Sequence, residues 1–173
     1  MKYTLTSAEA NKLLKKMMEE ENLLIMQEQQ THIFNASLGE DIESVRPEYD
    51  YSFIKTELEK YERKIRAIKH AINVFNIGTV VEGTGMTIDE VLVYIPQLSS
   101  KKSKLYRMQN RLPKQRTDFY GSRNNTIIDY TYANYDIEEA KKDLLAVSAE
   151  LSRVQTALDL VNSTVTFDIE LED

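Results

Sequence analysis

A cluster of cations between Val91 and Arg123 is the part of the sequence best suited to binding chemistry. It contains eight lysines and arginines against one acid, Asp118, so the segment carries a net charge of +7 while the rest of the chain carries −13. Aromatic side chains are interleaved with these cations over residues 94–123. Cations bind phosphate, and aromatic rings stack on bases. The candidate ligand-binding residues are Lys101, Lys102, Lys104, Tyr106, Arg107, Arg111, Lys114, Arg116, Tyr120 and Arg123.

Two interpretations of this segment are open from the residues alone. In the first, the segment binds an anionic small ligand such as a nucleotide. Arg107, Arg111 and Arg116 carry most weight here, because a planar guanidinium group can bind phosphate through two donors. Arg107 and Arg111 are four residues apart, which predicts that they share one helix face. In the second interpretation, the cations form salt bridges with acidic faces of neighbouring helices, for example around Glu19–Glu21.

Catalytic and metal-binding chemistry find little support in the sequence. The chain has no cysteine and two histidines, His32 and His70, and neither histidine has the spacing of a metal site or of a serine–histidine pair. The turn at Gly83-Thr84-Gly85 lacks the lysine of a phosphate-binding loop. The acidic pair Glu138-Glu139 suits the first turn of a helix. We therefore expect no enzyme activity, no metal and no cofactor.

Helices must position most of these side chains. Five glycines and three prolines in 173 residues favour long regular helices. Capping boxes at Thr6–Glu9 and Thr87–Glu90, and an acidic first turn at Asp136–Glu139, predict three helix N-termini. Pro96 should kink or divide the helix that contains it. The predicted helices cover about 7–30, 50–76, 88–112 and 137–162.

Two of these helices carry an apolar seam of the coiled-coil type. Apolar residues over 54–75 and 137–161 follow the alternating three- and four-residue spacing of a heptad repeat, so the two seams are long enough to pair with each other. Alternating apolar residues predict strands at about 79–82, 126–133 and 164–171. The predicted fold is a single domain over 1–173, mainly α with a small antiparallel β-sheet (α+β). Long antiparallel helices would form a coiled-coil bundle, and about three short strands would gather into one sheet.

The composition also suggests where the protein works and with which partners. No apolar stretch approaches the length of a membrane span, and Met1–Thr6 contains no apolar signal core, so we expect a cytoplasmic protein with no membrane partner. The net charge of −6 argues against nucleic acid as a partner. Since coiled-coil seams favour association, the expected partners are further copies of the chain, forming a homo-oligomer, and a phosphorylated small molecule or cyclic nucleotide.

Two stretches of the chain resemble a known family. Met86-Thr87-Ile88-Asp89-Glu90-Val91-Leu92, and the helix end Leu158-Asp159-Leu160-Val161-Asn162-Ser163-Thr164, resemble the septicolysin-like family of uncharacterised bacterial and phage helical coiled-coil proteins, in order over roughly residues 55–165. The resemblance implies a helical hairpin with a small sheet, a ring-like homo-oligomer and no established catalytic residues. The family name suggests a cytolysin, but nothing in the chain looks like a membrane-inserting segment. Related-looking sequences fit bacterial mobile elements or phage, which implies a role in sequestering a signalling nucleotide.

Overall fold

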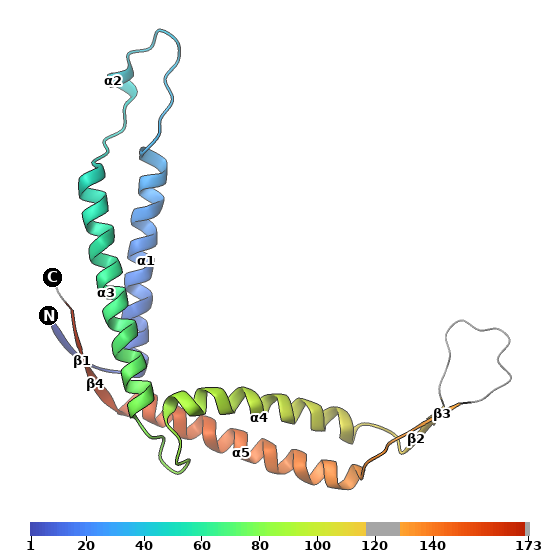
Figure 1. Ribbon diagram of the computed structural model, residues 1–173. Helices are drawn as coiled ribbons and strands as arrows, with labels where there is room; N and C mark the ends of the chain where they lie inside the picture. The colour runs from blue at the N-terminus through green and yellow to red at the C-terminus, as the bar shows by residue number, and fades with distance from the viewer. Residues whose placement is uncertain (117–128, 172–173) are drawn as a thin grey trace, which may run out of the picture. The chain divides into compact units, whose positions relative to one another are not determined.

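The protein is built mainly from helices with a small β component, as predicted. The computed structural model describes residues 1–116 and 129–171, and Figure 1 shows the course of the chain. The described strands form two separate antiparallel pairs, β1 with β4 and β2 with β3. In chain order the elements are β1 (Lys2–Thr6), α1 (Ser7–Thr31), α2 (Ile42–Val45), α3 (Tyr51–Gly78), α4 (Ile88–Gln109), β2 (Lys114–Arg116), β3 (Tyr130–Tyr132), α5 (Ile137–Thr164) and β4 (Thr166–Glu170).

The chain divides into two compact units. Unit 1 comprises Met1–Thr79 together with Leu160–Asp173, and unit 2 comprises Val80–Asp159. The last residues of α5 therefore belong to unit 1 and its earlier turns to unit 2. The single domain over residues 1–173 stays a prediction, because each unit is defined by its own internal contacts.

Unit 1 is organised around α1 and α3, which pack side by side (Figure 1). The predicted capping box opens α1: Thr6 Oγ1 accepts a hydrogen bond from the backbone N–H of Glu9 at 3.3 Å, and Glu9 Oε2 accepts one from the backbone N–H of Thr6 at 2.9 Å. Asp50 caps α3 by accepting a hydrogen bond from the N–H of Phe53 at 3.0 Å. These oxygens satisfy donors that the first turn of a helix leaves free, which fixes where both helices begin.

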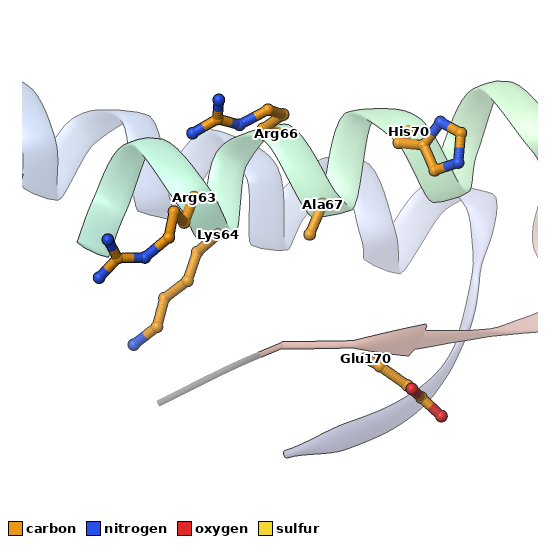
Figure 2. A pocket seen from close by; sticks show the side chains of 6 residues that line it. All are labelled: Arg63, Lys64, Arg66, Ala67, His70 and Glu170. Atoms are coloured by element: carbon orange, nitrogen blue, oxygen red, sulfur yellow. The ribbon is translucent and has the colours of Figure 1, made fainter. Parts of the chain in front are cut away.

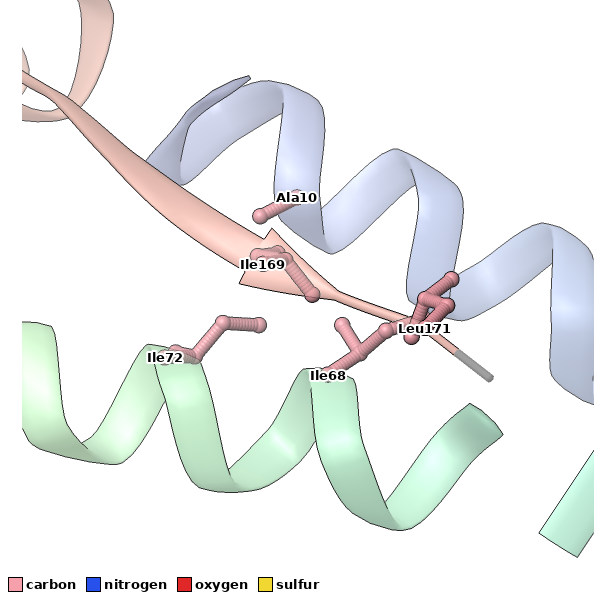
Figure 3. Close-up of a cluster of buried hydrophobic side chains, with 5 residues drawn as sticks. All are labelled: Ala10, Ile68, Ile72, Ile169 and Leu171. Carbon is pink, nitrogen blue, oxygen red and sulfur yellow. The ribbon is translucent and has the colours of Figure 1, made fainter. Parts of the chain in front are cut away.

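The apolar core of unit 1 lies between α1, α3 and the β4 segment. Figure 3 shows Ile169 and Leu171 between Ala10 on α1 and Ile68 and Ile72 on α3. Ala10 and Ile68 are fully buried, with no exposed surface. Burial of this kind is the main stabilising term in folding, so these five side chains hold the unit together.

The seam of α3 is covered by α1 and β4. Besides the core contacts of Ile68 and Ile72, Phe75 near the end of α3 stacks on Phe167 of β4, with ring centroids 4.4 Å apart. The sequence instead suggested that the seam over 54–75 pairs with the seam over 137–161. A heptad pattern specifies an apolar face but does not name the element that covers it.

The first strand, β1, is an element that the sequence pattern did not predict. It pairs antiparallel with β4, with Tyr3 opposite Ile169 and Leu5 opposite Phe167. Thr4 Oγ1 donates a hydrogen bond to Asp168 Oδ1 at 2.6 Å across 164 positions of sequence. A five-residue strand carries too little alternation to be recognised alone, and its partner is far away in the chain.

The expected strand at 79–82 is a single bridge instead, and the expected single sheet is two pairs of strands. Val80 forms an isolated antiparallel bridge with Thr87. Gly83 (φ 74°) and Gly85 (φ 69°) adopt left-handed backbone conformations between these two residues. Such a tight turn leaves no room for a longer ladder, because the capping box of α4 begins at Thr87 itself.

Unit 2 is an antiparallel pair formed by α4 and the part of α5 that precedes Leu160 (Figure 1). Two hydrogen bonds tie opposite ends of the pair. Tyr135 Oη, just before α5, donates to the carbonyl oxygen of Met108 at 2.8 Å, and Arg153 Nη1, further along α5, donates to the carbonyl oxygen of Gly83 at 2.8 Å. The buried apolar side chains of the pair are Ile88, Val91, Leu98 and Leu105 on α4, and Ala140, Leu144, Val147, Leu151, Val154 and Leu158 on α5.

Helix α4 contains Pro96 without being divided by it, and it ends earlier than the residue 112 that we expected. The helix runs from Ile88 to Gln109, with Asn110 as its C-cap. The N–H of Arg111 donates to the carbonyl oxygen of Met108 at 3.2 Å in a tighter turn. Arg111 therefore lies outside the helix.

Candidate functional site

The β2–β3 pair in unit 2 gathers two of the predicted cations with two tyrosines. Lys114 lies opposite Tyr132, and Arg116 lies opposite Tyr130. Side chains two residues apart in a strand point to the same face, and so do the side chains of directly opposed residues. Lys114, Arg116, Tyr130 and Tyr132 therefore share one face of the pair, which we call the hairpin face.

Lys114 lies over both tyrosine rings of the hairpin face. Its Nζ atom is 4.1 Å from the centroid of Tyr130 and 5.5 Å from that of Tyr132, which are distances of cation–π contacts. Tyr130 is 46% exposed and Tyr132 is 61% exposed. The face therefore presents ring surface and positive charge together to solvent. Proteins that bind single-stranded nucleic acids combine positive charge and exposed rings in this way.

The described cations of the basic segment are exposed to solvent and form no ion pair with a carboxylate. Glu19 and Glu20 pair with Lys15 (3.7 Å) and Lys16 (3.8 Å) on their own helix. Within residues 1–116 and 129–171, the predicted cations have no ion pair with a carboxylate; these are Lys101, Lys102, Lys104, Arg107, Arg111, Lys114 and Arg116. Within unit 2, the described residues thus form no salt bridge of the second interpretation, and pairing with Glu19–Glu21, which belong to unit 1, stays a prediction.

The structure does not collect all of the predicted residues into one pocket. A hollow of about 140 Å³ is lined by Arg111, but the lysines of α4, Tyr106 and Arg107 are not part of its wall. Because α4 ends at Gln109, the expectation that Arg107 and Arg111 share one helix face is wrong. Tyr120 and Arg123 lie outside the described residues. The hollow is lined by Arg111, Leu112, Gln115, Thr131, Tyr132, Ala133 and Tyr135.

The tyrosines of the hairpin face were not among the residues selected from sequence. The alternation over 126–133 placed Tyr130 and Tyr132 on one face of a strand, and that signal was present. The sequence did not indicate the partner strand, because residues 114–116 resemble a polar loop when they are considered alone. Only the register between these two short strands brings the rings beside Lys114.

The described residues contain neither a candidate metal site nor a helix that could span a membrane. Among the described residues, no group of three or more histidine, aspartate or glutamate side chains is placed to hold a metal ion. None of the described helices combines the length and the apolar character needed to cross a bilayer.

Comparison with known proteins gives a likeness of fold. No family model matches the chain, and no curated protein matches it. Among solved structures, the chain is similar to the crystal structure of a functionally unknown conserved protein from Corynebacterium diphtheriae. The TM-score is 0.60 at 18% sequence identity, over 95% of this chain and 99% of that chain. At this identity the likeness concerns the fold alone.

Proposed function

We propose that this protein is a non-enzymatic, homo-oligomeric helical binding protein, and that its basic segment binds an anionic small ligand such as a nucleotide. The observation that carries the proposal is the position of Lys114 over the exposed rings of Tyr130 and Tyr132. A nucleotide offers a base that can stack on a ring and phosphates that can accept hydrogen bonds from the cations. A sequestering role, in which the protein holds a signalling nucleotide, follows from such binding.

The binding is tested by calorimetry and thermal unfolding with a panel of nucleotides and cyclic dinucleotides. A ligand at a hundred times its dissociation constant should stabilise the folded protein by about 2.7 kcal/mol. The double variant Lys114→Gln with Arg116→Gln should bind at least about ten-fold more weakly, since it loses two charge-assisted contacts. The variants Arg107→Ala and Arg111→Ala then test whether residues at and just after the end of α4 contribute to ligand affinity.

A matched control comes from the same unit. Lys141→Gln with Lys142→Gln on α5 removes the same charge, and Lys141 pairs with Glu138 rather than facing the tyrosines. This control should bind like the unaltered protein. Tyr132→Leu should weaken binding of a nucleotide but leave binding of inorganic phosphate unchanged. Unchanged melting curves across the whole panel would refute ligand binding.

Self-association is supported by apolar side chains on the outer surfaces of the helices. In unit 2, Leu92, Val93 and Leu145 are 47%, 58% and 72% exposed. Covering such side chains with a second copy of the chain would remove apolar surface from water. Light scattering coupled to size exclusion tests the oligomer, and a strict monomer at all concentrations would contradict it.

The same observation favours a second candidate, a structural or partner-binding coiled-coil module without a ligand. Under this alternative, Leu92→Ser with Val93→Ser dissociates the assembly, while the double glutamine variant of Lys114 and Arg116 leaves both the melting temperature and the oligomer unchanged. Under the first proposal, the glutamine variant no longer binds the ligand but still forms the oligomer.

Kinship with the septicolysin-like family, a bacterial or phage origin and a cytoplasmic location belong to the same proposal. A sequence or structure from a septicolysin-like member tests the kinship directly.

A further inference from the structure

A second group of unpaired cations lies in unit 1, on α3, on a different element from the hairpin face. Arg63, Lys64, Arg66 and Lys69 fall within two turns of this helix. Elsewhere on the same helix, Lys55 pairs with Glu59 at 4.0 Å and Lys60 pairs with Glu57. Across the described part of the chain, by contrast, the four cations at 63–69 have no ion pair with a carboxylate.

Helix α3 places like charges three residues apart within this group, although Glu59 and Glu62 lie four residues before Arg63 and Arg66. Arg63 and Arg66 are three residues apart, and so are Arg66 and Lys69. Like charges at this spacing are neighbours on a helix surface and repel each other. Some surface cations elsewhere in the described residues do pair with acids three or four residues away, as Lys15 does with Glu19 and Arg153 with Glu150. An anion bound beside α3 would lower the repulsion that remains between these cations.

Three of these cations, Arg63, Lys64 and Arg66, border a hollow of about 630 Å³, a volume typical of sites for small molecules. Figure 2 shows Arg63, Lys64 and Ala67 directed to the β4 side of α3, and Arg66 directed to the opposite side. Ala67 lies between these cations on the helix and is partly buried against the core of unit 1. The hollow, which we call the α3 hollow, is lined by Arg63, Lys64, Arg66, Ala67, His70 and Glu170.

The chemistry of the α3 hollow selects an anion of high charge density. Among the described lining residues, Glu170 of β4 is the one acid, against three permanent cations and the imidazole of His70. Arg63 offers a forked donor, Lys64 a point charge and His70 a ring N–H, and each of these can donate to phosphate oxygens. Among the described lining residues there is no phenylalanine or tyrosine ring on which a base could stack.

We propose that the α3 hollow binds the phosphate groups of a ligand that carries two or more of them in series, with Arg63 and Lys64 as the principal donors and His70 as a third. The site is independent of the hairpin face, because it belongs to unit 1 and the hairpin face to unit 2. It recognises the phosphate chain itself, whereas the hairpin face recognises a ring together with its phosphate.

The test is calorimetric titration of the full chain with inorganic tripolyphosphate at low ionic strength, where electrostatic contacts are least screened. Arg63→Gln with Lys64→Gln should weaken binding at least about ten-fold, because two charge-assisted contacts are lost. Glutamine forms helices well, so the variant should fold, and circular dichroism checks this. The matched control, Lys15→Gln with Lys16→Gln, removes equal charge from adjacent exposed residues of α1 in the same unit. Its binding should change less than about two-fold.

Two further titrations distinguish phosphate recognition in the α3 hollow from a general attraction for anions and from binding at the hairpin face. Citrate carries a comparable charge on carboxylates, and it should bind at least about ten-fold more weakly than tripolyphosphate. The glutamine variant of Lys114 and Arg116 should bind tripolyphosphate with a dissociation constant within about two-fold of that of the unaltered protein. The two proposals can therefore fail independently of each other. Three results would overturn the inference: no binding at millimolar tripolyphosphate, equal losses in the α1 and α3 variants, or citrate binding as tightly as tripolyphosphate.

Discussion

The hydroxyl of Tyr135 donates a hydrogen bond to the carbonyl oxygen of Met108 at 2.8 Å, and this contact joins the start of α5 to the end of α4. Met108 lies in the last turn of α4, where carbonyl groups have no N–H partner within the helix. The same oxygen accepts the N–H of Arg111 at 3.2 Å. Tyr135 therefore fixes the point at which the chain leaves α4 and enters β2.

Tyr135→Phe should lower the free energy of unfolding by about 1 kcal/mol, since the ring is kept and one partly buried hydrogen bond is lost. Urea denaturation followed by circular dichroism measures the change. Tyr106→Phe is the control, because Tyr106 is 58% exposed on the same unit and should change stability by less than about 0.5 kcal/mol. Equal effects of the two substitutions would mean that the bond to Met108 contributes nothing.

Ile68→Ala should destabilise the protein by about 2–5 kcal/mol, because Ile68 has no exposed surface and its truncation leaves a cavity between α1, α3 and β4. Ile77→Ala makes the same chemical change on the same helix at a side chain that is 64% exposed. The control should cost less than about 1 kcal/mol. Chemical denaturation of both variants provides the comparison, and a small loss for Ile68→Ala would show that the core forms elsewhere.

Pro96→Ala should stabilise the protein by about 1–3 kcal/mol. A proline inside a helix removes one backbone hydrogen bond and crowds the carbonyl of the residue four positions earlier, here Leu92. Because α4 continues through Pro96, alanine should restore that bond without moving the helix. Thermal unfolding measures the gain. A decrease in melting temperature would indicate that the proline shapes α4 to fit its neighbours.

The ion pair between Lys2 and Asp168 predicts a dependence of stability on pH. The Lys2 ammonium, 2.8 Å from the carboxylate, lowers the pKa of Asp168 below its usual 3.8, with help from the hydroxyl of Thr4. A depressed pKa stabilises the fold above about pH 3.8, and this contribution disappears as the pH falls through the lowered pKa. Asp168→Asn should therefore destabilise at pH 7, and its difference from the unaltered protein should shrink as the pH falls through the lowered pKa.

At alkaline pH the same pair acts through Lys2. Hydrogen bonding to Asp168 raises the pKa of Lys2 above 10.5, so its contribution is complete below that pH and is lost as the pH rises through the raised pKa. Denaturant titrations of the unaltered protein and Asp168→Asn at pH 2, 7 and 11 test both limits. A constant difference across the three values would contradict the linkage.

Local chemistry explains which parts of the fold could be predicted. Both predicted capping boxes are present, because a hydroxyl and a glutamate three residues apart satisfy each other's backbone groups without help from the rest of the chain. The apolar spacing of α3 and α5 likewise marks the buried faces correctly, as the burial of Ile68 and Leu151 shows.

Pairing between distant segments is what the sequence could not supply. The partner of the α3 seam is a helix and a strand, and the strand β4 comes after unit 2 in the chain. The same limit applies to the candidate site. The cations were visible in the sequence, but the rings that lie beside Lys114 depend on the register of β2 and β3. Arg63 and Lys64 look like ordinary polar residues between seam positions, since a hollow is a property of packing.

The pairing of β1 with β4 has a consequence for synthesis on the ribosome. Thr4 and Asp168 are 164 positions apart, so the first strand is translated long before its partner exists. During that interval the nascent chain holds Ala10 and Ile68 without the residues that cover them. The helices α4 and α5, whose contacts are closer in sequence, can form first. The growing polypeptide therefore carries an uncovered apolar surface on α1 and α3 until Ile169 and Leu171 emerge. During this stage, chaperone binding and aggregation compete with folding.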